Sequence, residues 1–138
     1  MRRPLTALLI CALPAAFPVA ASPAAGKPAA VKPMTAQLLK LETSTRMEQR
    51  CNGRAAGSIR REHRGFDPDE VVAYAFADSV IEGAHVEAPG AAIRSHGHWY
   101  HVAYSCRATA DGLGIETFAY TLGDEVPRGQ WSDHDLVP

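Results

Sequence analysis

The stretch His98-Trp99-Tyr100-His101-Val102-Ala103-Tyr104-Ser105-Cys106 alternates between two sets of side chains, as a half-buried β-strand does. One face of this strand carries Tyr100, Val102, Tyr104 and Cys106. The opposite face carries Trp99, His101, Ala103, Ser105 and, just beyond the quoted stretch, Arg107. Because the strand ends on a cysteine, it is a candidate for the place where two parts of the molecule are joined covalently.

The first 21 residues have the layout of a secretory signal peptide. Two arginines follow the initial methionine, and residues 5–21 then contain no charge and end on small side chains. A membrane-spanning helix needs about 20 apolar residues, whereas Pro14 and Pro18 interrupt this segment. We predict cleavage after Ala21 and an exported mature protein, periplasmic or secreted, without a transmembrane span.

Cys11 lies inside this signal, and acylation of a lipoprotein cysteine would need a small residue where Ile10 stands. We therefore expect Cys11 to be removed with the signal peptide. Residues 22–33 consist mainly of Ala, Pro, Gly and Lys and have little to bury, which is typical of a linker. Residues 34–138 remain, a length suited to a single domain.

The two cysteines left in the mature chain are Cys51 and Cys106. In an exported protein such a pair is most simply explained by one disulfide. A pair of free or redox-active thiols is the alternative, although the chain has no Cys-x-x-Cys motif. If the bond forms, the face of the strand that carries Cys106 must be the one that packs on the segment around Cys51.

That segment is predicted to be an amphipathic helix. Thr45 and Glu48 have the spacing of a capping box. Four residues recur at every fourth position and form one apolar stripe: Met47, Cys51, Ala55 and Ile59. Six arginines fall within about a third of the circumference away from that stripe: Arg46, Arg50, Arg54, Arg60, Arg61 and Arg64. Gly53 and Gly57 each cost the helix roughly 1 kcal/mol relative to alanine, so it needs a packing partner.

Charge is distributed unevenly along the domain. Residues 40–65 contain seven basic and three acidic side chains, a net charge of +4, whereas residues 66–138 contain three basic and twelve acidic ones, a net charge of −9. Arg46, Arg50 and Arg54 are therefore candidates for binding anionic lipid headgroups, a cell-wall polymer or an acidic protein. The alternative is a solvated face that the acidic remainder partly neutralises. Export and the lack of interleaved aromatic residues argue against nucleic acid.

The rest of the chain has the pattern of a sheet. We predict a strand over residues 71–77 whose bulky Val72, Tyr74 and Phe76 are buried, and a turn over residues 78–83. A second strand over residues 84–94 is interrupted at Pro89-Gly90, which indicates a bulge or an edge. Residues 95–97 then form a hairpin turn into the quoted stretch.

The last predicted strand covers residues 113–122 and directs Phe118, Tyr120 and Leu122 inward. Glu116 has the same parity, so it must lie at the sheet margin or the register must shift. Beyond this strand, Val126, Trp131 and Leu136 are expected to dock a C-terminal tail. The fold class is α+β: one N-terminal helix packed on an antiparallel sheet of about four strands, with one disulfide.

These segments resemble a family of exported bacterial proteins known as domain of unknown function 930 (DUF930). The resemblance covers about residues 41–136 and rests on the order and spacing of Arg46 to Cys51, Phe66 to Asp69, Val72 to Asp78, Ala88 to Ser95, Trp99-Tyr100, Cys106, Phe118 to Tyr120, and Gly123 to Trp131. It implies an exported domain with a paired cysteine and brings no activity with it. The histidines near Gly97 lie outside the family pattern.

Two groups of side chains could bind a metal or take part in catalysis, and each also has a simpler structural explanation. His96, His98 and His101 are the weak candidates for a zinc or copper site, with His85 or an acid as a further ligand. The simpler interpretation is a solvated hairpin tip. Carboxylates sit just before a predicted strand, yet they also fit an ordinary turn around a proline: Asp67, Asp69 and Glu70. No cofactor and no assembled catalytic set are predicted.

Trp99, His101 and Arg107 share one strand face and are a second candidate binding surface. Burial of Trp99 under the tail, against Trp131 or Leu136, is the alternative. The sequence thus predicts an exported cell-envelope domain, most simply a non-catalytic binding protein for an unknown envelope protein or polymer. The rival hypothesis is a small metal-binding protein or enzyme centred on His96, His98 and His101.

Overall fold

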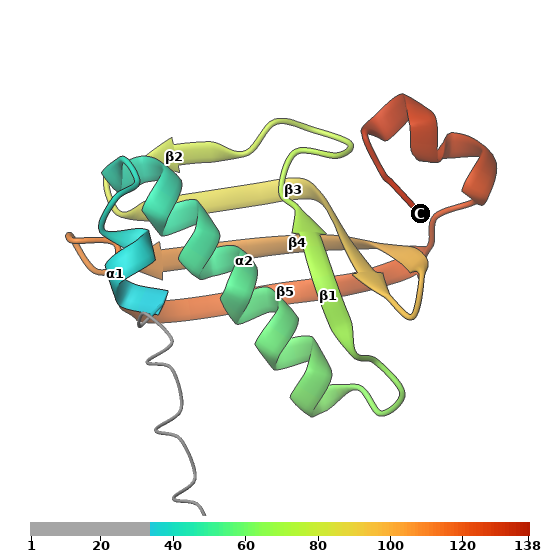
Figure 1. Cartoon of the computed structure of the whole chain (residues 1–138), viewed down its shortest axis with the longest axis horizontal. Helices are drawn as coiled ribbons and strands as arrows, with labels where there is room; N and C mark the ends of the chain where they lie inside the picture. The colour runs from blue at the N-terminus through green and yellow to red at the C-terminus, as the bar shows by residue number, and fades with distance from the viewer. Residues whose placement is uncertain (1–33) are drawn as a thin grey trace, which may run out of the picture. The chain divides into compact units, whose positions relative to one another are not determined.

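The computed structural model of the chain describes residues 34–138 (Figure 1). The predicted signal peptide and linker, residues 1–21 and 22–33, lie outside the described residues. The elements are α1 (Met34–Leu38), α2 (Thr43–Glu62), β1 (Pro68–Val72), β2 (Val80–Glu82), β3 (His85–Ser95), β4 (His98–Ala108), β5 (Ile115–Glu125) and the 3-10 helix η1 (Arg128–His134). In this part of the chain, no helix is long and apolar enough to cross a membrane.

The strands form one antiparallel sheet in the order β1-β3-β4-β5, and β2 also pairs with β3. β2 pairs with the first residues of β3 and β1 with the last, so both lie along the same edge of that strand. α2 crosses one face of the sheet diagonally, with β1 beside it (Figure 1). The α+β class is confirmed, with five strands rather than about four.

The hairpin between β3 and β4 has the tight turn that the sequence predicted. Ser95 pairs with His98, which leaves His96 and Gly97 as a two-residue loop. Both loop residues have positive φ, 52° and 76°, as the favoured hairpin turn requires. This turn fixes the register of the two longest neighbouring strands.

Cys51 and Cys106 form a disulfide that joins the middle of α2 to β4, with a Cα–Cα distance of 6.0 Å. Both cysteines are fully buried, and the apolar stripe of α2 packs with them into one core. Val102 and Tyr104 of β4 belong to the same core, as the predicted choice of strand face required. The disulfide and the packing of the apolar stripe both require the same side of α2 to face the sheet.

The predicted capping box is wrong. α2 begins at Thr43, so Thr45 lies inside the helix, and no side chain caps its first turn. Glu48 instead accepts a hydrogen bond from the Ser79 hydroxyl at 2.8 Å. The helix begins earlier than its side-chain pattern suggested because α1 leads into it through a short turn that Arg46 stabilises.

The strand predicted over residues 71–77 is also displaced. β1 ends at Val72, and beyond it Ala73 and Ala75 are buried whereas Tyr74, predicted to be buried, is 56% exposed. Val72 and Phe76, the other two residues predicted to be buried, are half-buried against the C-terminal core. The cause is a close crossing of the chain over β3. The amide of Phe76 donates to the carbonyl of Gly90 at 2.7 Å, and small side chains are needed on the inner side of this crossing.

Gly90 permits that crossing because a Cβ there would lie 2.2 Å from the backbone nitrogen of Ala77. Here the ladder between β3 and β4 shifts register between Ala88 and Ala91, so the predicted break is a bulge rather than an edge. The turn expected over residues 78–83 contains the short strand β2.

Phe118, Tyr120 and Leu122 of β5 pack against the core, as predicted. Glu116 is exposed to solvent, although it has the same parity as these residues, because the ladder between β4 and β5 shifts register between Arg107 and Ala108. The register shift was one of the two outcomes that its parity allowed.

The C-terminal tail forms a second, smaller core. Val126, Trp131 and Leu136 are buried with Ala92 and Trp99 on the side of the sheet away from the disulfide. Trp99 is 0% exposed, and its indole N–H donates to the carbonyl of Val137 at 2.8 Å. The tail therefore covers this end of the sheet.

Loss of the disulfide is expected to destabilise the domain without changing its fold. Closing a loop of the 55-residue separation between Cys51 and Cys106 removes chain entropy worth about 4 kcal/mol from the unfolded state. We expect the Cys51→Ser, Cys106→Ser double variant to lose a free energy of unfolding of that order. Urea unfolding followed by tryptophan fluorescence measures it, and an unchanged midpoint would contradict the prediction.

Candidate binding site along the basic helix

The arginines of α2 have different partners. The Arg46 guanidinium donates to the carbonyls of Leu38 and Leu41, both at 2.9 Å, and to the carbonyl of Asp111. It therefore holds three chain segments together at the start of the helix. At the other end, Arg60 pairs with Asp67 at 2.7 Å and also donates to the Pro68 carbonyl.

Arg50, Arg54 and Arg61 form no ion pair with any acidic side chain of residues 34–138. They line a groove of about 470 Å³ between α2 and the start of β5. We call this the basic groove and define it by Arg50, Gly53, Arg54, Gly57, Arg61 and Ile115. The predicted candidates were Arg46, Arg50 and Arg54. In the structure Arg46 binds backbone carbonyls instead, and Arg61 takes its place beside Arg50 and Arg54.

The Nε of Arg50 is the one side-chain polar atom in the described residues that is buried without a hydrogen-bond partner. Such a group costs on the order of 1–3 kcal/mol when it stays unsatisfied. Because Nε is shielded from solvent, an anion would be bound by the terminal nitrogens of Arg50, which are not buried. Arg50 therefore has unused capacity for an anion.

The two glycines of the helix lie between these arginines. A Cβ on Gly53 would meet nothing within 4 Å, so packing does not require a glycine there. A Cβ on Gly57 would lie 3.2 Å from a terminal nitrogen of Arg61. The helix backbone is therefore exposed at Gly53, whereas the Arg61 guanidinium lies close to Gly57.

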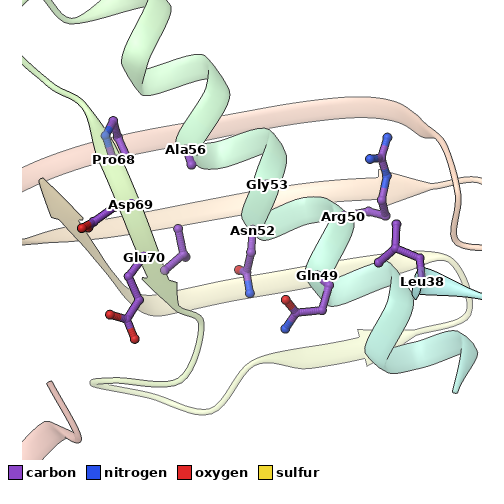
Figure 2. Close-up of a pocket in the computed structure, with 10 residues that line it drawn as sticks. Leu38, Gln49, Arg50, Asn52, Gly53, Ala56, Pro68, Asp69 and Glu70 are labelled. Atoms are coloured by element: carbon purple, nitrogen blue, oxygen red, sulfur yellow. The ribbon is translucent and has the colours of Figure 1, made fainter. Parts of the chain in front are cut away.

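A second groove of about 460 Å³ lies between α2 and β1. Figure 2 shows Gln49 and Asn52 extending from the helix into it, with Asp69 and Glu70 on the facing strand. We call it the polar groove and define it by its lining: Leu38, Gln49, Arg50, Asn52, Gly53, Ala56 and residues 68–71. Arg50 and Gly53 line both grooves, which therefore meet at the crest of the helix.

Asn52 is 7% exposed and its side-chain oxygen accepts a hydrogen bond from the Tyr104 hydroxyl at 2.7 Å. Burial raises the pKa of Tyr104, so this phenol stays protonated and keeps donating. The bond fixes the orientation of the Asn52 amide. Its N–H₂ group has no acceptor among residues 34–138 and remains available to a ligand.

The acidic residues of β1 serve as ion-pair partners. Arg94 contacts Asp69 and Glu70, each at 3.0 Å, and the hydrogen bond from Arg94 lowers the pKa of Asp69. Asp67 pairs with Arg60 as described. The carboxylates considered for catalysis thus serve as ion-pair partners that hold β1 against α2 and β3.

The three candidate metal ligands do not converge. His96 bonds to the Gly65 carbonyl at 3.1 Å, and His98 bonds to Glu125 at 2.7 Å. The ring of His101 lies on Phe76, with 4.3 Å between centroids. Within residues 34–138, no three His, Cys, Asp or Glu side chains are placed to hold a metal ion.

The second candidate binding surface, formed by Trp99, His101 and Arg107, is not one continuous exposed patch. Trp99 is buried under the tail, His101 is half-buried beside Phe76, and Arg107 is exposed on the open part of the sheet. Near Arg107, Ser105 donates to Glu87 at 2.7 Å and lies 3.0 Å from His85. The serine proton is directed to the carboxylate rather than to the imidazole, unlike the arrangement that activates a serine nucleophile.

We expect no stoichiometric zinc to remain on the domain after equilibration with zinc and desalting, because the three histidines bind separate partners. Elemental analysis of the purified protein measures the zinc content. Stoichiometric zinc that disappears in the His98→Ala, His101→Ala variant would contradict this prediction and revive the metal hypothesis.

A pH effect is expected at the end of α2, where the Tyr120 hydroxyl donates to Glu62 at 2.7 Å and lies 3.0 Å from a ring nitrogen of His63. Desolvation and the neighbouring Glu62 carboxylate raise the pKa of Tyr120 to about 12. An unfolded tyrosine ionises near pH ~10. The folded state thus holds this proton more tightly, and the stability that it provides is lost as the pH rises from 10 towards 12.

Urea unfolding over that pH range tests the effect in the wild type and in Tyr120→Phe. We expect the free energy of unfolding to fall less steeply with pH in the variant. Tyr104 is present in both proteins and provides the matched background. Equal slopes would contradict the prediction.

Comparison with known proteins supplies the family. Residues 38–136 match the model of Domain of Unknown Function (DUF930), which is nearly the whole described region and agrees with the resemblance seen in the sequence. Searches of curated proteins and of solved structures found no match to the chain. The match includes both cysteines of the disulfide and every residue of the two grooves. The chain therefore belongs to the DUF930 family.

Proposed function

We propose that this protein is an exported, non-catalytic binding domain of the cell envelope that binds an acidic partner through the basic groove. The observation that carries the proposal is the set of Arg50, Arg54 and Arg61, which share one groove and have no carboxylate partner in the described residues. Unpaired cations that converge on a concave surface attract an anionic partner.

Charge elsewhere on the domain supports this choice. Residues 66–138 carry a net charge of −9, so an acidic partner is repelled from most of the surface and directed to the helix. The Cys51–Cys106 disulfide and the signal-like N-terminal sequence both fit an oxidising compartment. The acidic residues and histidines considered for chemistry are engaged in structural contacts, which favours binding over catalysis.

The test compares the wild type with the Arg54→Glu, Arg61→Glu variant in binding to three soluble polyanions: a peptide of alternating Glu and Ala, polygalacturonate and polyphosphate. At least one should bind the wild type, and its affinity should fall about tenfold or more in the variant. The same affinity should decrease with salt, because exposed charges are screened.

The control is Arg128→Glu, a single charge reversal in η1, which lies away from α2 (Figure 1) and where Arg128 lies over the ring of Trp131. Its binding should equal that of the wild type. Equal binding by the wild type and the groove variant, or no binding to any of the three polyanions, would overturn the proposed function.

A further inference from the structure

We infer that the basic and polar grooves form one continuous site for an extended acidic peptide of a partner protein, crossing α2 at Gly53. This inference rests on the proposed function and names the class of its ligand. The structural basis is that Arg50 and Gly53 line both grooves. Because Gly53 has no side chain and its Cβ direction is open, a chain lying across the helix meets no barrier there.

The polar groove offers groups that match a peptide backbone, and the two carboxylates in its lining, Asp69 and Glu70, are both paired with Arg94. Asn52 presents N–H donors, since its oxygen is already occupied by Tyr104. Gln49 is exposed on the same side of the helix and has both a donor and an acceptor free for a ligand. Peptide groups alternate carbonyl acceptors and N–H donors, so two neighbouring side-chain amides suit them.

The basic groove supplies the specificity for acidic side chains. The three arginines span the eleven positions from Arg50 to Arg61, or about 16 Å along the helix axis. An extended peptide covers that distance with about five residues and places alternate side chains on one face. Acidic residues at alternate positions match the spacing of about 6 Å between Arg50 and Arg54, and an acidic residue further along the segment would meet Arg61, about 10 Å beyond Arg54.

The side chains that line the two grooves favour a peptide over other anionic polymers. Neither groove has an aromatic residue in its lining, so there is no platform on which nucleic-acid bases or sugar rings could stack. The apolar residues there are aliphatic and small or medium in size: Leu38, Ala56, Val71 and Ile115. These suit the small side chains of a peptide.

Gly53→Gln is the decisive variant. Glutamine favours a helix over glycine by roughly 1 kcal/mol, and no atom obstructs its Cβ, so the variant should unfold at a higher temperature than the wild type. Its side chain would nevertheless fill the crossing between the grooves. We expect affinity for a fluorescently labelled Glu/Ala peptide of about ten residues to fall about tenfold, measured by fluorescence anisotropy.

Gly53→Ala is the matched control, because it makes the same gain in helix stability with the smallest side chain and should retain most of the affinity. Gln49→Ala provides a second test on an exposed residue whose loss should not affect folding. It should weaken the peptide about threefold and leave polyphosphate binding unchanged, since only the peptide uses side-chain amides.

The outcomes separate this inference from the proposed function. Arginine-dependent binding of polyphosphate or polygalacturonate, but not of the peptide, would overturn the peptide inference and leave the basic groove as an anion site. Unchanged peptide affinity in folded Gly53→Gln would overturn the continuous site. Absence of arginine-dependent binding to all three polyanions would remove both proposals.

Discussion

The disulfide between Cys51 and Cys106 is the contact on which the rest of the domain depends. It fixes which side of α2 faces the sheet, and with it which face of β4 is buried. Helical geometry then places residues 50, 54 and 61 on the outer side, because they lie away from the stripe that carries Cys51. The buried stripe of α2, together with the disulfide within it, thus decides where the positive charge appears on the surface.

The two ends of α2 show why only some of this charge is free. Arg46 and Arg60 bind carbonyls and a carboxylate of neighbouring segments, so they anchor the helix at its beginning and its end. The three arginines of the basic groove have no carboxylate or carbonyl partner in residues 34–138, and Arg61 donates only to the Ser58 hydroxyl at 3.2 Å. The same helix therefore combines a structural role at its termini with the proposed binding surface in its middle, where Gly53 and Gly57 weaken the helix.

Much of the fold followed from local patterns. The stripe of α2 and the two faces of β4 were correct because side-chain periodicity directly reflects burial. The errors occurred at Thr45 and over residues 71–77, where other segments intervene. α1 starts the helix early, and a crossing over Gly90 selects small residues on the buried side.

The sequence by itself determined the charge asymmetry, the pairing of two cysteines and the side of α2 that faces solvent, since these depend on composition and helical spacing. Tertiary structure alone decided which arginines lack an ion-pair or carbonyl partner, because Leu38, Asp67 and Asp111, all outside α2, occupy the others. It also placed Trp99 under the tail and separated the histidines. Side-chain partners are set by packing between segments, and no local pattern encodes them.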